Sequence, residues 1–225
     1  MIICVPNVLA ADELGTIRKE LEHAPFVDGA TTAGWSAREV KRNQQVDPRS
    51  ESHGRMADIM RNAFLRNGLL QAALLPAATT MAMFNRYGTG MQYGPHVDTA
   101  VMGGMGSAVR SDIAITLFLS DPESYDGGEL VVHTSGMEYE FKLKAGEAIA
   151  YPANTLHHVK PVTRGVRQAG IMWVQSLVRD PARRELLWDL ESAKRQIFGK
   201  EGKTETFDAI SRSHANLLRM WADVI

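Results

Sequence analysis

The chain has 225 residues, and its 25 basic and 26 acidic side chains leave a formal net charge of −1. This length suits one domain with helical additions, and the balanced charge excludes a broad basic surface, so we expect neither nucleic acid nor an anionic membrane as a partner. Cys4 is the single cysteine, which excludes an intrachain disulfide and a zinc or iron–sulfur cluster held by the cysteines of one chain. Any bound metal must therefore have His, Asp or Glu ligands.

The N-terminal segment and the apolar runs bear on the location of the protein. Residues 1–14 contain no basic n-region, and no run approaches about 18 uninterrupted apolar residues, so we expect neither a signal peptide nor a membrane span. A single unpaired cysteine also fits a reducing compartment. We therefore expect a cytoplasmic protein.

The N-terminal part of the chain is predicted to be mainly helical. Apolar residues spaced by three and four predict a helix over 10–23. A second helix is predicted over 50–67, with Ser50 as its N-cap and Gly68 just beyond its end. Residues 26–49 between them are polar and irregular.

From residue 78 the pattern changes to short apolar runs separated by turn residues. Residues 138–144 alternate between apolar and polar side chains, as a half-exposed strand does. Many short strands at this spacing indicate an all-β sandwich, barrel or jelly roll. The predicted strands are Thr79–Tyr87, Ser111–Ser120, Glu129–His133, Met137–Leu143, Glu147–Tyr151, His157–Val162 and Val166–Val178.

Helical periodicity returns after Asp180-Pro181, a favourable helix start, and predicts helices over 181–198 and 204–222. The chain therefore divides into an N-terminal helical region that packs on the core (1–77), a β domain (78–178) and a C-terminal helical extension (179–225). We expect the terminal helices either to shape a substrate entrance or to form a homo-oligomer interface.

The tripeptide His96-Val97-Asp98 is the first candidate for a metal site. In an extended segment, residues two apart point to the same face, so His96 and Asp98 can offer a nitrogen and an oxygen to one ion. Two His and one carboxylate on one face of a metal leave the other positions open, which suits Fe(II) and oxygen chemistry. The tripeptide alone favours an ordinary histidine at the surface or core edge, so further residues are needed to support a metal site.

A third ligand is available in the pair His157-His158. Adjacent strand residues face opposite ways, so only one of the two can join the site, and the residues alone leave both open. A turn at Arg164-Gly165 can then return Arg167 to the same neighbourhood. A guanidinium there can bind a carboxylate through two hydrogen bonds and stays charged at any relevant pH.

Six short segments between Met83 and Arg179 strengthen this interpretation. They are Asn85-Arg86-Tyr87-Gly88, His96-Val97-Asp98, Arg110-Ser111-Asp112, Asp126-Gly127-Gly128-Glu129-Leu130, Pro161-Val162-Thr163-Arg164-Gly165-Val166-Arg167 and Gln175-Ser176-Leu177-Val178-Arg179. With them the sequence resembles the Fe(II)- and 2-oxoglutarate-dependent dioxygenase superfamily in its prolyl/lysyl-hydroxylase-like branch. It is most similar to the bacterial PKHD-type hydroxylases, which are associated with iron uptake, and the resemblance covers nearly the whole chain.

The resemblance implies a fold and a set of site residues. The fold is mainly β with flanking helices, and has a double-stranded β-helix (jelly roll) core. The iron ligands and catalytic residues are His96, Asp98 and His157, because Arg167 then lies at the family spacing of ten and matches the 2-oxoglutarate carboxylate anchor. His158 would instead put Gln168 at that spacing. Tyr87 matches a tyrosine whose hydroxyl touches 2-oxoglutarate; otherwise it is a strand-end residue that packs on the core.

The resemblance also implies the reaction. An Fe(II)- and 2-oxoglutarate-dependent hydroxylase couples oxidative decarboxylation of 2-oxoglutarate by O₂ to hydroxylation of a second substrate, with L-ascorbate as reductant and a link to iron homeostasis. The substrate stays open between an amino acid, a peptide, a protein residue and a siderophore-like metabolite. The Gly- and Met-rich segment 99–109 is either a flexible loop or a substrate lid.

Two other functions compete with this one. A His₂Asp zinc hydrolase could use the same fold, but hydrolysis needs no dicarboxylate anchor such as Arg167. A non-catalytic protein that senses iron or 2-oxoglutarate would also keep the same residues, although an intact ligand set favours turnover.

Overall fold

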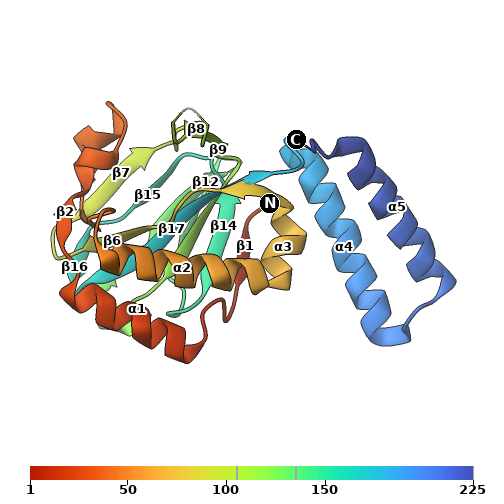
Figure 1. The fold of residues 1–225 in the computed structure, drawn as a ribbon, viewed down its shortest axis with the longest axis horizontal. Helices are drawn as coiled ribbons and strands as arrows, with labels where there is room; N and C mark the ends of the chain where they lie inside the picture. Colours follow the sequence, from red (N-terminus) through yellow and green to blue (C-terminus); the bar gives the residue numbers. More distant parts are fainter. Residues whose placement is uncertain (105, 135, 225) are drawn as a thin grey trace.

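The computed structural model describes residues 1–104, 106–134 and 136–224, and its main feature is a sandwich of two antiparallel sheets. Five α-helices lie outside the two sheets: α1 (Ala11–His23), α2 (Glu51–Arg66), α3 (Gly68–Leu74), α4 (Pro181–Glu201) and α5 (Glu205–Trp221). Three short 3₁₀ helices are η1 (Gly29–Thr32), η2 (Ala37–Val40) and η3 (Pro122–Ser124). Figure 1 shows α1 and α2 side by side along one face of the sandwich.

The larger sheet has the strand order β1-β14-β10-β17-β6-β4-β2, and β5 pairs with β17 outside that path. Its strands are β1 (Ile3–Val5), β2 (Phe26–Asp28), β4 (Gln44–Val46), β5 (Pro76–Thr79), β6 (Met83–Tyr87), β10 (Ile113–Phe118), β14 (Ala148–Pro152) and β17 (Arg167–Ser176). The longest of them, β17, runs through the middle and pairs with both β10 and β6.

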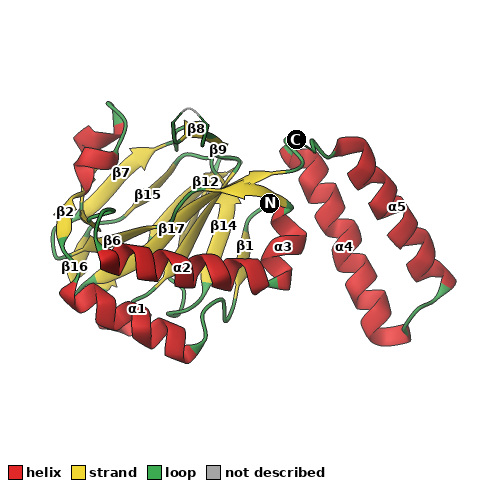
Figure 2. Ribbon diagram, in the orientation of Figure 1, coloured by secondary structure: helices red, strands yellow, loops and turns green. Residues whose placement is uncertain are grey.

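The smaller sheet has the order β13-β12-β15-β7-β3. Its strands are β3 (Lys41–Arg42), β7 (Gln92–His96), β12 (Leu130–Thr134), β13 (Met137–Phe141) and β15 (His157–Val159). Two short ribbons complete the described strands: β8 (Val101–Met102) with β9 (Val109–Arg110), and β11 (Asp126–Gly127) with β16 (Val162–Arg164). Figure 2 shows these strands in yellow, with the helices in red outside them.

Alternation along the central strands separates two hydrophobic cores. On β10, Ile113, Ile115 and Leu117 belong to the core beneath α1, α2 and α3, whereas Ala114 and Phe118 belong to the core between the sheets. Successive side chains on a strand point to opposite faces, so one strand contributes to both layers. The inner core therefore faces the smaller sheet, where His96 and His157 lie.

The described architecture confirms the expected fold class, with strands flanked by N-terminal helices and a C-terminal helical pair. The division at residues 77 and 178 stays a prediction. None of the described helices is long and apolar enough to cross a membrane.

One local expectation was wrong in the N-terminal part. Residues 26–49 are not irregular, because β2 and β4 pair with each other and β3 pairs with β7. Short polar strands carry little periodicity, which explains why the sequence pattern missed them.

The predicted second helix is confirmed, because α2 has Ser50 as its N-cap and Asn67 as its C-cap, and Gly68 lies just beyond its end. A further helix, α3, begins at once, because the Asn67 side chain accepts hydrogen bonds from the amides of Leu69 and Leu70.

The C-terminal helices α4 and α5 form an antiparallel pair that projects beside the sandwich (Figure 1). The Arg184 side chain fastens the start of α4, because its guanidinium donates hydrogen bonds of 2.7 Å to the carbonyls of Val178 and Arg179. The rings of Phe198 and Phe207 meet near the other end of the pair, with centroids 5.3 Å apart.

We expect Leu117→Ala to lower the free energy of unfolding by about 2–5 kcal/mol, because Leu117 is fully buried on β10 and its truncation leaves a cavity under the helices. Urea denaturation would measure the loss. The matched control is Leu65→Ala on α2, where the side chain is 53% exposed, and its effect should stay below about 1 kcal/mol. Equal losses in the two variants would contradict this account of the core.

Candidate metal centre

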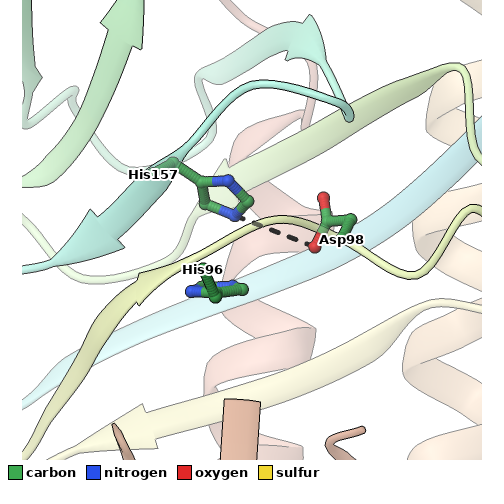
Figure 3. Close-up of side chains that lie close together, drawn as sticks. All are labelled: His96, Asp98 and His157. Atoms are coloured by element: carbon green, nitrogen blue, oxygen red, sulfur yellow. Dashed lines mark ion pairs between the residues drawn. The ribbon is translucent and has the colours of Figure 1, made fainter. Parts of the chain in front are cut away.

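Three side chains converge between β7 and β15, as Figure 3 shows. One ligand atom from each of His96, Asp98 and His157 lies within 4.8 Å of the other two. His96 and His157 are directly opposite each other on the paired strands, and Asp98 follows the end of β7 by two residues. The His157 Nε2 atom is 3.8 Å from Asp98 Oδ1, too far for a hydrogen bond but suitable for two atoms that share one ion.

Both histidines present the same ring nitrogen to the centre. His96 Nδ1 lies 2.9 Å from the Gly94 carbonyl oxygen, and His157 Nδ1 lies 2.9 Å from that of Thr155. A carbonyl only accepts, so each Nδ1 carries the proton and donates it. Each Nε2 therefore keeps its lone pair, and the backbone fixes the tautomer that a metal requires.

Burial changes the pKa values of His96 and Asp98 in opposite directions. Removal from water, with a smaller contribution from His157, lowers the pKa of His96 to about 3. Burial raises the pKa of the Asp98 carboxyl, and its Oδ2 atom has no hydrogen-bond partner among the described residues. A buried carboxylate oxygen without a partner is costly, and a cation at the centre would remove that cost.

Two aromatic rings hold the histidines in place, and the sequence pattern did not identify either. Tyr93 stacks on His96 with centroids 3.6 Å apart, and the edge of Tyr151 meets His157 at 5.1 Å. Tyr93 lies three residues before His96 on β7, so a search for aromatic neighbours on the ligand strand would have found it.

Arg167 and Tyr87 lie at the inner end of the same space. The two residues are paired in register on β17 and β6, and the guanidinium carbon lies 5.2 Å from the Tyr87 ring centre. Arg167 is only 1% exposed, yet its Nε and Nη1 atoms have no hydrogen-bond partner among the described residues. The Tyr87 hydroxyl is likewise buried without a partner, and burial raises its pKa. A buried cation with unsatisfied donors indicates an anionic ligand.

A glycine makes room for the Arg167 side chain. Gly128 has φ +68, and a Cβ atom there would lie 3.1 Å from the Arg167 Cδ atom. The position thus needs glycine both for its backbone conformation and for the space that Arg167 occupies.

One cavity of about 660 Å³ contains all of these groups. It is lined by the three candidate ligands, Arg167 and Tyr87, and by residues that the sequence pattern did not single out, among them Lys41, Asn85, Thr116 and Trp35. Four residues of the segment 99–109 also line it: Thr99, Val101, Met102 and Gly103. Met105 of that segment is outside the described residues. The two interpretations of the segment 99–109, a flexible loop and a substrate lid, both stay predictions.

His158 lies outside this cavity. Its neighbour on β15, His157, points inward, and His158 instead has its Nδ1 atom 3.2 Å from His133 Nε2. Alternation along β15 thus separates the two histidines, as the parity of a strand requires.

Comparison with known proteins identifies a family pattern in the same region. Residues 82–175 match the model of the 2OG-Fe(II) oxygenase superfamily. A PKHD-type hydroxylase of Synechococcus sp. (strain JA-2-3B'a(2-13)) is 48% identical over 224 residues, which cover 100% of both chains. A PKHD-type hydroxylase of Acaryochloris marina is also 48% identical, over 99% of this chain and 100% of its own.

Solved structures show the same fold at low sequence identity. A Pseudomonas putida prolyl-4-hydroxylase aligns with a TM-score of 0.52 and 19% identity, over 78% of this chain and 92% of its own. A Trichoplax adhaerens prolyl hydroxylase, solved with a peptide fragment of hypoxia inducible factor, aligns with a TM-score of 0.54 and 16% identity over 82% and 86%.

The depressed pKa of His96 predicts a pH dependence in the metal-free protein. Between about pH 6.5 and pH 3, the unfolded chain binds a proton at His96 that the folded chain does not bind, so falling pH favours unfolding. Below pH 6.5 the unfolding free energy of the wild type should fall relative to that of His96→Gln, by up to about 1.4 kcal/mol per pH unit. Urea denaturation in a chelator at several pH values measures this difference.

The comparison with His96→Gln isolates the contribution of His96. This is needed because the raised pKa of Asp98 changes the unfolding free energy with pH in the opposite direction. His23→Gln, at the exposed end of α1, is the control and should follow the wild type. A constant difference between the wild type and His96→Gln at all pH values would contradict the prediction.

Proposed function

The chain belongs to the PKHD-type hydroxylases of the 2OG-Fe(II) oxygenase superfamily, and from this premise we propose roles for its individual side chains. The observation that carries the proposal is the convergence of two imidazole Nε2 lone pairs and an unpartnered carboxylate on one point, with a buried guanidinium in the same cavity. His96, Asp98 and His157 would hold Fe(II), and Arg167 would hold the cosubstrate.

The donor set fits Fe(II). Two neutral imidazoles and one carboxylate on one face of an ion leave the opposite positions open for the cosubstrate and oxygen. Bound there, Fe(II) supplies the centre at which O₂ converts 2-oxoglutarate to succinate and CO₂ while a second substrate is hydroxylated. The carbonyls of Gly94 and Thr155 would orient the two ligand rings through their Nδ1 atoms.

The Arg167 guanidinium would bind the carboxylate of 2-oxoglutarate that lies away from the metal. Two of its donor nitrogens are buried without a partner, which favours an anionic ligand, and its burial strengthens the attraction. The Tyr87 hydroxyl, paired across the strands from Arg167, would donate a hydrogen bond to the same cosubstrate. Phe118, whose ring centre lies 5.6 Å from the guanidinium carbon, helps to exclude water there.

Three further points belong to the same proposal and rest on the family resemblance. L-ascorbate would serve as the reductant that keeps the iron ferrous. The reaction would be linked to iron homeostasis, in the cytoplasm, where an unpaired thiol such as that of Cys4 stays reduced. The helices α4 and α5 would serve as an interface between copies of the chain.

The buried Arg167 is also the observation that separates this function from a zinc hydrolase. A hydrolase has no use for a dicarboxylate anchor in the metal cavity. A sensor would bind 2-oxoglutarate without consuming it, so the release of succinate distinguishes the two.

We expect the adjacent histidines to differ sharply in function. His157→Ala should reduce succinate release by at least about 100-fold and weaken Fe(II) binding, because it removes a ligand. His158→Ala is the matched control one residue away, on the opposite face of β15, and should keep activity within about threefold. Succinate formation and equilibrium dialysis of iron measure both effects. Equal losses in the two variants would contradict the ligand assignment.

We expect Arg167→Gln to raise the KM for 2-oxoglutarate at least about tenfold, because the carboxylate loses a charged and doubly hydrogen-bonded partner. Fe(II) binding should not change. Arg164→Gln is the control, since Arg164 is exposed and pairs with Asp126 outside the cavity. An unchanged KM in Arg167→Gln would exclude this residue as the anchor.

A further inference from the structure

Lys41 is a buried cation inside the cavity to which the reaction described above gives no task. It lies on β3 at the edge of the smaller sheet, opposite Tyr93 of β7, and is 6% exposed. Its Nζ atom donates a hydrogen bond of 3.1 Å to Thr32 Oγ1 and lies 5.2 Å from the centre of the Tyr93 ring. Tyr93 also stacks on His96, so the same tyrosine ring lies next to both the Lys41 ammonium and a candidate metal ligand.

The ammonium has no carboxylate partner among the described residues. No Asp or Glu oxygen of that part of the chain lies within 4.0 Å of it, although fourteen other Lys, Arg or amino-terminal groups form such pairs there. Burial lowers the pKa of Lys41 to about 8, so the group is largely protonated at neutral pH. A protonated, buried and unpaired amine is costly unless a ligand brings the compensating charge.

When the cavity holds Fe(II) and 2-oxoglutarate, the charges inside it sum to one positive charge. Among the described residues that line it, Lys41 and Arg167 are cationic and Asp98 is anionic, while a histidine that binds a metal does so as the neutral imidazole. Fe(II) and doubly charged 2-oxoglutarate cancel each other, and Asp98 cancels Arg167. The positive charge of Lys41 then remains without a compensating negative charge. This sum rests on the proposed function, because it includes Fe(II) and 2-oxoglutarate.

Exposed apolar side chains also line the cavity that contains Lys41. Trp35 is 81% exposed, and Val97 and Val101 are also exposed while lining the cavity. Exposed apolar groups at the rim of a cavity mark a surface that binds an apolar part of a ligand. The rim and the buried amine together describe an amphiphilic ligand.

We propose that Lys41 binds a carboxylate of the substrate to be hydroxylated, and that this substrate is a monoanion with an apolar or aromatic body. The ammonium and the Thr32 hydroxyl form its carboxylate site, and Trp35 with Val97 and Val101 contacts its body. The site is separate from Arg167, which keeps the cosubstrate. Lys41 therefore determines specificity and takes no part in holding the metal.

The test compares acids with their amides on the protein supplied with Fe(II) and saturating 2-oxoglutarate under nitrogen. The probes are phenylacetate, 3-phenylpropionate and 4-phenylbutyrate, each with its carboxamide, and calorimetric titration measures their binding without turnover. At least one acid should bind the wild type about tenfold or more tightly than its amide, the contribution of a charge-assisted hydrogen bond. Lys41→Met should remove this preference and Lys41→Arg should retain most of it.

Lys142→Met is the matched control. Lys142 also lies over a tyrosine, 4.2 Å from the Tyr125 ring centre, but outside the cavity. It should keep the wild-type preference for acids. The proposal is overturned if no acid in the series exceeds its amide, or if Lys41→Met keeps the preference.

Titration with 2-oxoglutarate separates this proposal from the proposed function. Lys41→Met should bind 2-oxoglutarate within about twofold of the wild type, whereas a large loss would place Lys41 in the cosubstrate site and overturn the proposal. If the wild type itself failed to bind 2-oxoglutarate, the proposed function would fall. In that case, the preference for acids over their amides could still be measured in the Arg167→Gln variant, where it would depend on Lys41 alone.

Discussion

The pairing of β15 with β7 is the constraint on which the rest of the site depends. It places His157 directly opposite His96, although the two are far apart in the sequence, and two residues of extended chain then bring Asp98 to the same point. Every other group in the cavity is positioned relative to this pair of strands. Tyr93 stacks on one histidine from within β7, and β3 adds Lys41 to the outer edge of the same strand.

The second sheet supplies a different kind of group. Its central strand β17 starts at Arg167 and sends alternate side chains into the layer between the sheets, so that the buried guanidinium lies near the Phe118 ring and lines the same cavity as Trp173. Low polarity strengthens the attraction between this cation and an anion and makes the cation costly when alone. The sandwich thus places the three candidate metal ligands on one wall and a buried guanidinium with unpartnered donors on the other.

Much of this could be predicted from the sequence, because strand parity and residue chemistry are local properties. The i, i+2 spacing of His96 and Asp98 placed them on one face, and the same parity allowed only one of His157 and His158 to join them. Lys41 could not be found in this way, since it lies in a two-residue strand within a segment that has no hydrophobic period. Its position depends on a pairing with β7 that only the tertiary structure defines.

The two consecutive histidines also have a consequence for folding. Because side chains alternate along a strand, a register slip of one residue in β15 would turn His158 inward and His157 outward, and the metal site would still contain a histidine. The same slip carried into β17 would replace the guanidinium of Arg167 by the amide of Gln168. A mispaired chain could therefore hold an ion but would lack the charge needed for its acidic cosubstrate. Occupancy of the ion alone is thus a poor measure of correctly folded protein.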